Sequence, residues 1–223
     1  MRSLAQRILP ALVLFICDFQ PGVAAGGTAT YTLETAAPSA SRTGLNVTEI
    51  GDAITVTTGP LRFVVSKTRF NLLDRAWLDV NGDGQFGTDE EMIAPGASEG
   101  PVVTASGTDY RAMEQPPASI SVEEQGPMKV VINVAGRHYD GTDALLKYET
   151  RIYAYAGQAF IRLRHVYANG TSVATLGDSG NPAFGAGIDR YALSLRLNPT
   201  TLLRFELLRT GGVAETKRMT LLR

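Results

Sequence analysis

The chain has 223 residues, of which 44% are hydrophobic and 19% are charged, and its formal net charge at pH 7 is −1. This near-neutral balance argues against nucleic acid or an anionic membrane surface as a partner, because both favour a basic protein surface. A chain of this size can bury one ordinary hydrophobic core without disulfides or metals, so we expect one main folded domain.

The N-terminus, residues 1–25, has the pattern of a secretory signal peptide. Arg2 and Arg7 form a short basic head, residues 8–17 form an apolar run, and small residues lead up to Ala25. This run is too short to span a bilayer, which needs about 20 apolar residues, and no later run predicts a span. We therefore expect cleavage after Ala25 and a secreted or periplasmic protein.

Cysteine chemistry is confined to that leader. The only cysteine is Cys17, and its removal leaves no thiol, disulfide or thiolate metal ligand. A lipid anchor on Cys17 is the alternative, but Ile16 occupies a position where such an anchor needs a small residue.

The pattern of the chain changes at residue 45. Residues 26–44 form a small, polar lead, whereas 45–198 contain short alternating runs separated by glycine and proline. Two-stranded units are predicted in 53–67 around Gly59-Pro60, in 119–139 around Gly126-Pro127 and in 148–170 around Ala156-Gly157-Gln158, followed by one strand in 191–198. Many short strands without a long helix predict an all-β fold, an antiparallel barrel or sandwich.

The C-terminal tail, residues 199–223, differs from what precedes it. It loses the strand alternation, and its paired leucines fit neither a strand nor a convincing amphipathic helix. This predicts an atypical tail, with truncation or a frameshift as its cause.

A candidate calcium loop lies between the first and second strand pairs. The segment that starts at Asp79 has the full D-x-N-x-D-G-x5-E pattern, in which oxygen atoms surround the cation. The flanking residues, including 71–80, lack the apolar spacing of EF-hand helices, so an EF-like loop on a β scaffold is expected. The alternative is a polar turn, because Asn-Gly and Asp-Gly are also hairpin signals. The predicted ligands are Asp79, Asn81, Asp83, the Gln85 carbonyl and Glu90.

The chain has two histidines, His138 and His165, on different predicted strands. They show no zinc-site spacing. His165 continues an apolar strand face, which predicts a partly buried, hydrogen-bonded core residue. His138 lies at a strand end and could act as a base, but no partner for it can be identified.

The strand pair in 148–170 also carries a candidate sugar-binding face. Three residues alternate on its first strand and two on its second, so the five share one polar surface if the two faces coincide. Guanidinium groups bind carboxylates in a bidentate manner, and tyrosine rings can stack on sugars. The alternative is an ordinary solvent face with cross-strand pairs. These residues are Arg151, Tyr153, Tyr155, Arg162 and Arg164.

Four phrases, in 58–67, 75–86, 122–138 and 148–167, resemble the exo-rhamnogalacturonan lyase-like (PcRGLX/YetA-like) family. The resemblance implies the N-terminal β domain of those proteins, a RIFT-type barrel. It also implies secreted enzymes that cleave the rhamnose–galacturonate backbone of pectin by β-elimination. Full-length members are expected to continue through a central β sandwich into a catalytic α/α toroid, for which this sequence shows no candidate residues.

The resemblance and the residues together support two main hypotheses. In the first, the chain is a non-catalytic domain, a fragment of a secreted pectin lyase-like protein that lacks its downstream domains, and no catalytic residue can be assigned. In the second, it is a stand-alone secreted carbohydrate-binding module with a structural calcium site. A calcium-stabilised surface protein without sugar affinity is a third reading. Pectic polysaccharide is the expected partner in the first two.

Overall fold

The computed structural model describes residues 23, 25–30, 44–168 and 188–198. The chain divides into two compact units, Met1–Ser39 and Ala40–Arg223, and every described strand lies in the second. Within the described residues all regular structure is β, and no helix that could cross a membrane is found there. The strands are β1 (Asn46–Ile50), β2 (Ala53–Thr57), β3 (Leu61–Ser66), β4 (Arg75–Leu78), β5 (Glu91–Ile93), β6 (Gly100–Ala105), β7 (Thr108–Arg111), β8 (Ser119–Gln125), β9 (Lys129–Tyr139), β10 (Ala144–Tyr155), β11 (Ile161–Ala168) and β12 (Ile188–Ser194).

Most of the predicted signal peptide, most of the polar lead and the whole tail 199–223 lie outside the described residues. The predicted signal peptide, with cleavage after Ala25, and the predicted polar lead therefore stay predictions.

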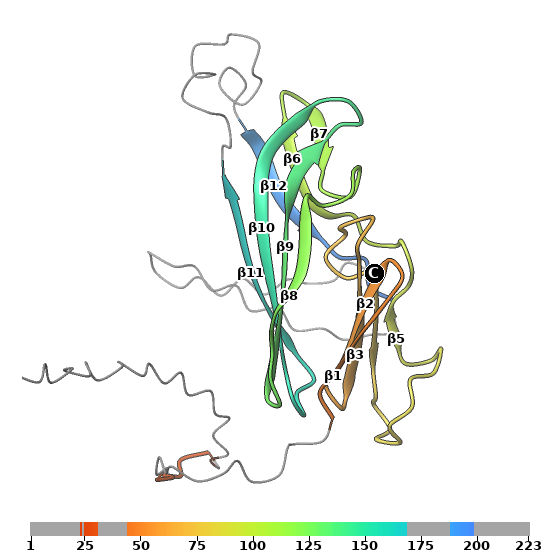
Figure 1. Cartoon of the computed structure of the whole chain (residues 1–223), viewed down its shortest axis with the longest axis vertical. Coiled ribbons are helices and arrows are strands. Elements are labelled where there is room, and N and C mark those ends of the chain that lie inside the picture. The colour runs from red at the N-terminus through yellow and green to blue at the C-terminus, as the bar shows by residue number, and fades with distance from the viewer. Residues whose placement is uncertain (1–22, 24, 31–43, 169–187, 199–223) are drawn as a thin grey trace, which may run out of the picture. The chain divides into compact units, whose positions relative to one another are not determined.

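The strands form two antiparallel sheets (Figure 1). The first has five strands in the order β1-β2-β3-β4-β5. The second has seven, in the order β11-β10-β9-β7-β6-β12, and β8 pairs with β9 off this path. The predicted all-β antiparallel fold is confirmed.

The three predicted strand pairs are present as hairpins: β2–β3, β8–β9 and β10–β11. In the first of them, Gly59 has a φ of 112°, a left-handed conformation that favours glycine. The Thr58 amide donates to the Leu61 carbonyl at 2.8 Å, and this closes the turn. Glycine at the turn and alternation on either side thus explain this hairpin directly.

A shared hydrophobic core lies between the two sheets. In β3 the burial alternates strictly, so that Phe63 and Val65 point inward, and β10 contributes Ile152 in the same way. Phe63, Val65 and Ile152 are fully buried in one cluster, which identifies the arrangement as a β sandwich.

The seven-stranded sheet extends beyond the five-stranded sheet and curls (Figure 1). A second small core inside it is formed by Val103, Ala105, Tyr110, Leu145 and Leu146. The strands β11 and β12 stand at opposite ends of the sheet order, yet their side chains are hydrogen-bonded to each other. The sheet is therefore curled far enough to bring its two outer strands together.

After β12 the chain crosses to the five-stranded sheet. The Asn198 amide donates to the Met92 carbonyl at 2.8 Å, and the Arg196 amide donates to Ser98 Oγ at 3.1 Å. Asn198 thereby lies beside β5, the last strand of the five-stranded sheet, and Arg196 lies beside the connection from β5 to β6.

Candidate functional site

The register of β10 and β11 brings the five predicted sugar-binding residues onto one face. Arg151 lies opposite Arg164, and Tyr153 lies opposite Arg162. Tyr155 ends β10, and its ring centroid is 5.9 Å from that of Phe160. This outer face, made of Arg151, Tyr153, Tyr155, Arg162 and Arg164, is called the Arg/Tyr surface below.

Arg151 is fully engaged by acidic residues of its own domain. Its Nε donates to Glu123 Oε2 at 2.6 Å and its Nη2 to Glu123 Oε1 at 3.0 Å, while Nη1 pairs with Glu149. The hydrogen bonds that Arg151 donates to Glu123 raise the pKa of Arg151 and lower the pKa of Glu123. The charge of Arg151 is therefore compensated locally.

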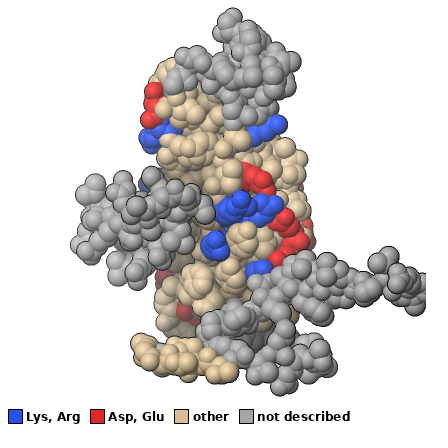
Figure 2. Space-filling view, turned by 90° about the vertical axis from the view of Figure 1, so that its left-hand side faces the viewer, with Lys and Arg blue, Asp and Glu red and all other residues tan. Residues whose placement is uncertain are grey.

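Arg162 and Arg164 differ from Arg151, because both are exposed. Within the described parts of the chain neither pairs with a carboxylate. The Arg162 guanidinium lies over the Tyr153 ring, 5.6 Å from its centroid. Figure 2 views the molecule from the β11 side and shows basic side chains next to acidic ones on this face. These two arginines are available to an anionic ligand.

The candidate calcium loop joins β4 to β5, so it has strands on both sides, as expected, and no EF-hand helices. Asp79 accepts hydrogen bonds from the amides of Gly82 at 2.7 Å and Gly84 at 2.9 Å. The Asn81 side-chain oxygen accepts from the Asp83 amide at 2.8 Å. The predicted ligands therefore cap backbone amides within the loop.

Glu90, the last predicted ligand, is only 6% exposed. Its carboxylate accepts from the amides of Val80 at 3.1 Å and Gly87 at 3.3 Å, which closes the loop at its base. Among the described residues no three side chains of His, Cys, Asp or Glu are placed together to hold a metal. Calcium binding by this loop stays a prediction.

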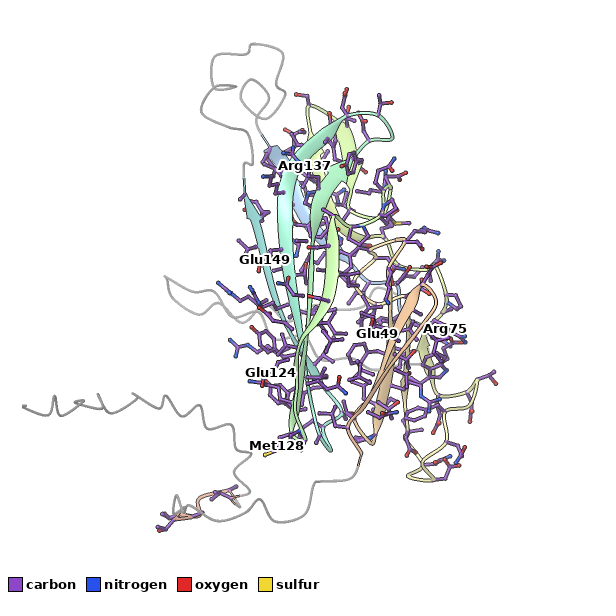
Figure 3. All side chains as sticks on the ribbon, in the orientation of Figure 1. Glu49, Arg75, Glu124, Met128, Arg137 and Glu149 are labelled. Carbon is purple, nitrogen blue, oxygen red and sulfur yellow. The ribbon has the colours of Figure 1, made fainter. Side chains whose placement is uncertain are left out.

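The outer face of the five-stranded sheet carries a second group of arginines and aromatic residues. Arg62 on β3 lies opposite Trp77 on β4, and its guanidinium is 4.2 Å from the centroid of the Phe86 ring. The Arg75 guanidinium is 4.4 Å from the Trp77 ring centroid, and its Nε donates to Glu91 Oε1 at 2.7 Å. Figure 3 shows Arg75 and Glu149 on opposite outer sides of the sandwich.

Sequence reasoning missed this face. Arg62 and Trp77 occupy outward positions of their strands, so strand alternation was the signal that could have found them. The pairing of Arg62 with Phe86, which belongs to the calcium loop, could not have been found in this way.

The two histidines lie inside the curled sheet. His138 is fully buried, with Nδ1 3.0 Å from the Leu146 carbonyl oxygen and Nε2 3.2 Å from the Tyr191 hydroxyl. His165 is half-buried, with Nδ1 2.7 Å from Thr150 Oγ1 and Nε2 also bonded to the Tyr191 hydroxyl. His165 is thus the hydrogen-bonded core residue that was expected. Burial excludes His138 from acting as a surface base.

Residues 45–174, more than half of the chain, match the family model described as the PcRGLX-like protein central beta sandwich domain. No curated protein matches the chain. The match agrees with the predicted family and corrects the predicted position within it, since the expected domain was the N-terminal barrel. The four sequence segments that carried the resemblance are strands and turns, and such segments carry no information about the order of domains in a longer protein.

Proposed function

We propose, since the chain belongs to the rhamnogalacturonan lyase-like (PcRGLX-like) family through its β-sandwich domain, that this domain binds acidic pectic polysaccharide without cleaving it. The observation that carries the proposal is the pair of exposed arginines, Arg162 and Arg164, which have no carboxylate partner in the described structure and lie beside Tyr153. Secretion belongs to the proposal and is supported by the signal-like pattern of residues 1–25.

The arrangement suits a polymer with repeated carboxylates. Arg162 and Arg164 are two residues apart on one strand, so they point the same way at a spacing of about 7 Å. Each guanidinium can form a bidentate pair with a uronate, and the Tyr153 ring adds a flat apolar contact for a sugar ring. Because the surface is exposed, salt should weaken the binding.

The absence of catalysis is proposed from the chemistry that β-elimination requires. A base must reach the proton next to the uronate, and a cationic group must stabilise the developing negative charge. The Arg/Tyr surface offers arginines, but His138 and His165 face the interior of the curled sheet and bond to Tyr191. Other domains of a full-length protein would supply the base.

The proposal is tested by isothermal titration of the full chain with rhamnogalacturonan I, polygalacturonate and a neutral galactan. We expect binding of the two acidic polymers only, and a loss of at least about tenfold in affinity for Arg162→Ala/Arg164→Ala. The matched control is Arg69→Ala/Arg190→Ala, which removes the same charge elsewhere on the domain.

Three results would contradict the proposal. Equal affinity of the Arg162→Ala/Arg164→Ala variant and the wild type would remove the Arg/Tyr surface as the site, and equal binding of galactan would remove the acidic specificity. Formation of unsaturated uronate by the purified chain would overturn the non-catalytic role.

A further inference from the structure

Three side chains from three strands meet at one point inside the curled sheet. His138 on β9 and His165 on β11 each direct Nε2 at the hydroxyl oxygen of Tyr191 on β12. They are the only histidines in the 223 residues. Two imidazole nitrogens and one phenol oxygen therefore converge, although the residues are far apart in sequence.

The opposite nitrogen of each ring is held by an oxygen atom. His138 Nδ1 is 3.0 Å from the Leu146 carbonyl oxygen, which can only accept, so Nδ1 carries the proton and Nε2 presents its lone pair to Tyr191. The Tyr191 hydroxyl then donates to His138, and its oxygen accepts from His165 Nε2. His165 Nδ1 in turn accepts from Thr150 Oγ1 at 2.7 Å.

This anchoring resembles the support that metal-ligating histidines receive. Such a histidine usually binds the ion through one nitrogen, while the other donates to a carbonyl or another oxygen that fixes the ring. Leu146 supplies that carbonyl for His138, and Thr150 supplies a hydroxyl for His165 that can either donate or accept. His165 can therefore carry its proton on Nδ1, keep its hydrogen bond with Thr150 Oγ1, and present the lone pair of Nε2 to the centre.

Ligation requires neutral imidazole rings, and the hydrogen bonds described above leave each ring with a single proton. Aromatic rings enclose the centre: Tyr148 stacks on His165 with centroids 6.2 Å apart, and Tyr167 stacks on Tyr191 with centroids 4.3 Å apart.

We propose that His138 Nε2, His165 Nε2 and the Tyr191 oxygen form a binding site for a divalent transition-metal ion that prefers nitrogen and oxygen donors, such as Cu²⁺ or Zn²⁺. Imidazole suits these ions, whereas Ca²⁺ and Mg²⁺ require a shell of oxygen atoms. The site is separate from both the calcium loop and the Arg/Tyr surface, and it does not depend on the proposed polysaccharide binding.

The protons balance as follows when the ion binds. The Nε2 proton of His165 is lost and Nδ1 gains one, which it donates to Thr150 Oγ1, so the ring stays neutral. His138 keeps its Nδ1 proton on the Leu146 carbonyl. Tyr191 loses its hydroxyl proton and binds as phenolate; burial raises the pKa of this hydroxyl, so the positive charge of the ion must stabilise the phenolate. One proton is released for each divalent ion, and the centre then carries a single positive charge.

The ion would link the two outer strands of the curled sheet. His165 and Tyr191 are half-buried, whereas His138 is fully buried. Because the ligands come from β9, β11 and β12, the folded chain binds the ion and the unfolded chain does not hold them together. Binding therefore raises the melting temperature.

The test uses the tag-free full chain titrated with Cu²⁺ and, in a second series, with Co²⁺ as a spectroscopic substitute for Zn²⁺. We expect one ion per chain, a visible phenolate-to-copper absorption band, and an affinity that rises about tenfold per pH unit because one proton is released. Tyr191→Phe should abolish the band and lower the affinity at least about tenfold. His165→Gln should lower it similarly.

Tyr167→Phe is the matched control, since it removes a neighbouring hydroxyl and leaves the three ligands in place. It should keep both the band and the affinity. Absence of binding by the wild type, or binding of equal strength in Tyr191→Phe and His165→Gln, would overturn the proposal. Thermal melting of the ion-free variants shows that each is folded, and a variant that has not folded is replaced by His138→Gln.

Discussion

The two outer faces of the sandwich carry the same residue types and use them differently. On the five-stranded sheet, Arg62 and Arg75 stack on Phe86 and Trp77, and Arg75 also bonds to Glu91. On the Arg/Tyr surface of the seven-stranded sheet, Arg151 is held by Glu123 and Glu149, whereas Arg162 and Arg164 keep exposed guanidinium groups without a carboxylate partner among the described residues.

The difference shows that the partners of an arginine, more than its presence, indicate its role. An arginine stacked on a ring of another segment holds the two segments together, as Arg62 does for the loop that carries Phe86. An exposed arginine next to an aromatic ring, such as Arg162 beside Tyr153, has its hydrogen-bond donors available for a ligand.

The largest effect on stability is expected in β10, because one side of this strand lies in the core and the other lies on the Arg/Tyr surface. Ile152 is fully buried between the sheets, and its neighbour Tyr153 faces outward. Ile152→Ala should lower the free energy of unfolding by about 2–5 kcal/mol, because it leaves a cavity. Tyr153→Ala should change it by about 1 kcal/mol or less while weakening polysaccharide binding. Chemical denaturation measures both, and equal losses would mean that the two sides of β10 do not differ as described.

Calcium binding is the test for the loop between β4 and β5. The contact between Arg62 on β3 and Phe86 in this loop attaches it to the five-stranded sheet. If the loop binds Ca²⁺, an excess of about 100 times the Kd should stabilise the fold by about 2.7 kcal/mol, seen as a higher melting temperature. Asp79→Ala should abolish that rise, and Asp89→Ala, an exposed change in the same loop, should keep it. A rise that persists without Asp79 would show that the ligands were assigned wrongly, and no rise in the wild type would remove the site.

Removing the carboxylate of Glu123 from Arg151 should increase the affinity of the Arg/Tyr surface for anions. Glu123→Gln removes the carboxylate that bonds to Arg151 twice. We expect the affinity for polygalacturonate to rise by up to about fivefold, in keeping with an exposed ion pair of about 1 kcal/mol or less. Glu124→Gln is the control, because it makes the same charge change at the ion pair with Lys129 and leaves the contacts of Arg151 intact. An equal rise in both variants would point to net charge alone.

The smallest expected effect is a change in stability or in binding that distinguishes the outer faces of the two sheets. Arg62→Ala should lower the free energy of unfolding by about 0.5–1 kcal/mol through the lost contact with Phe86 and leave polysaccharide binding unchanged. Arg162→Ala should do the opposite, weakening binding at nearly constant stability. Denaturation and titration on the same two variants measure this, and a loss of binding in Arg62→Ala would move the site to the other sheet.

Local patterns in the sequence were sufficient for the hairpins and for the polar side of β10. Gly59 with its left-handed φ, and the strict alternation of Arg151, Ile152 and Tyr153, follow from backbone sterics and the two-residue repeat of a strand. The strands β5 and β6 escaped prediction, because one has three residues and the other is buried almost continuously, so neither alternates over a readable length.

The sequence by itself therefore determined the all-β class, the main hairpins and which residues of a strand share a face, because each depends on neighbours along the chain. Only the tertiary structure decided that Glu123 neutralises Arg151 and that His138, His165 and Tyr191 meet. Those contacts depend on strand order and on the curl of a seven-stranded sheet. Both are set by burying one shared core, which no local pattern encodes.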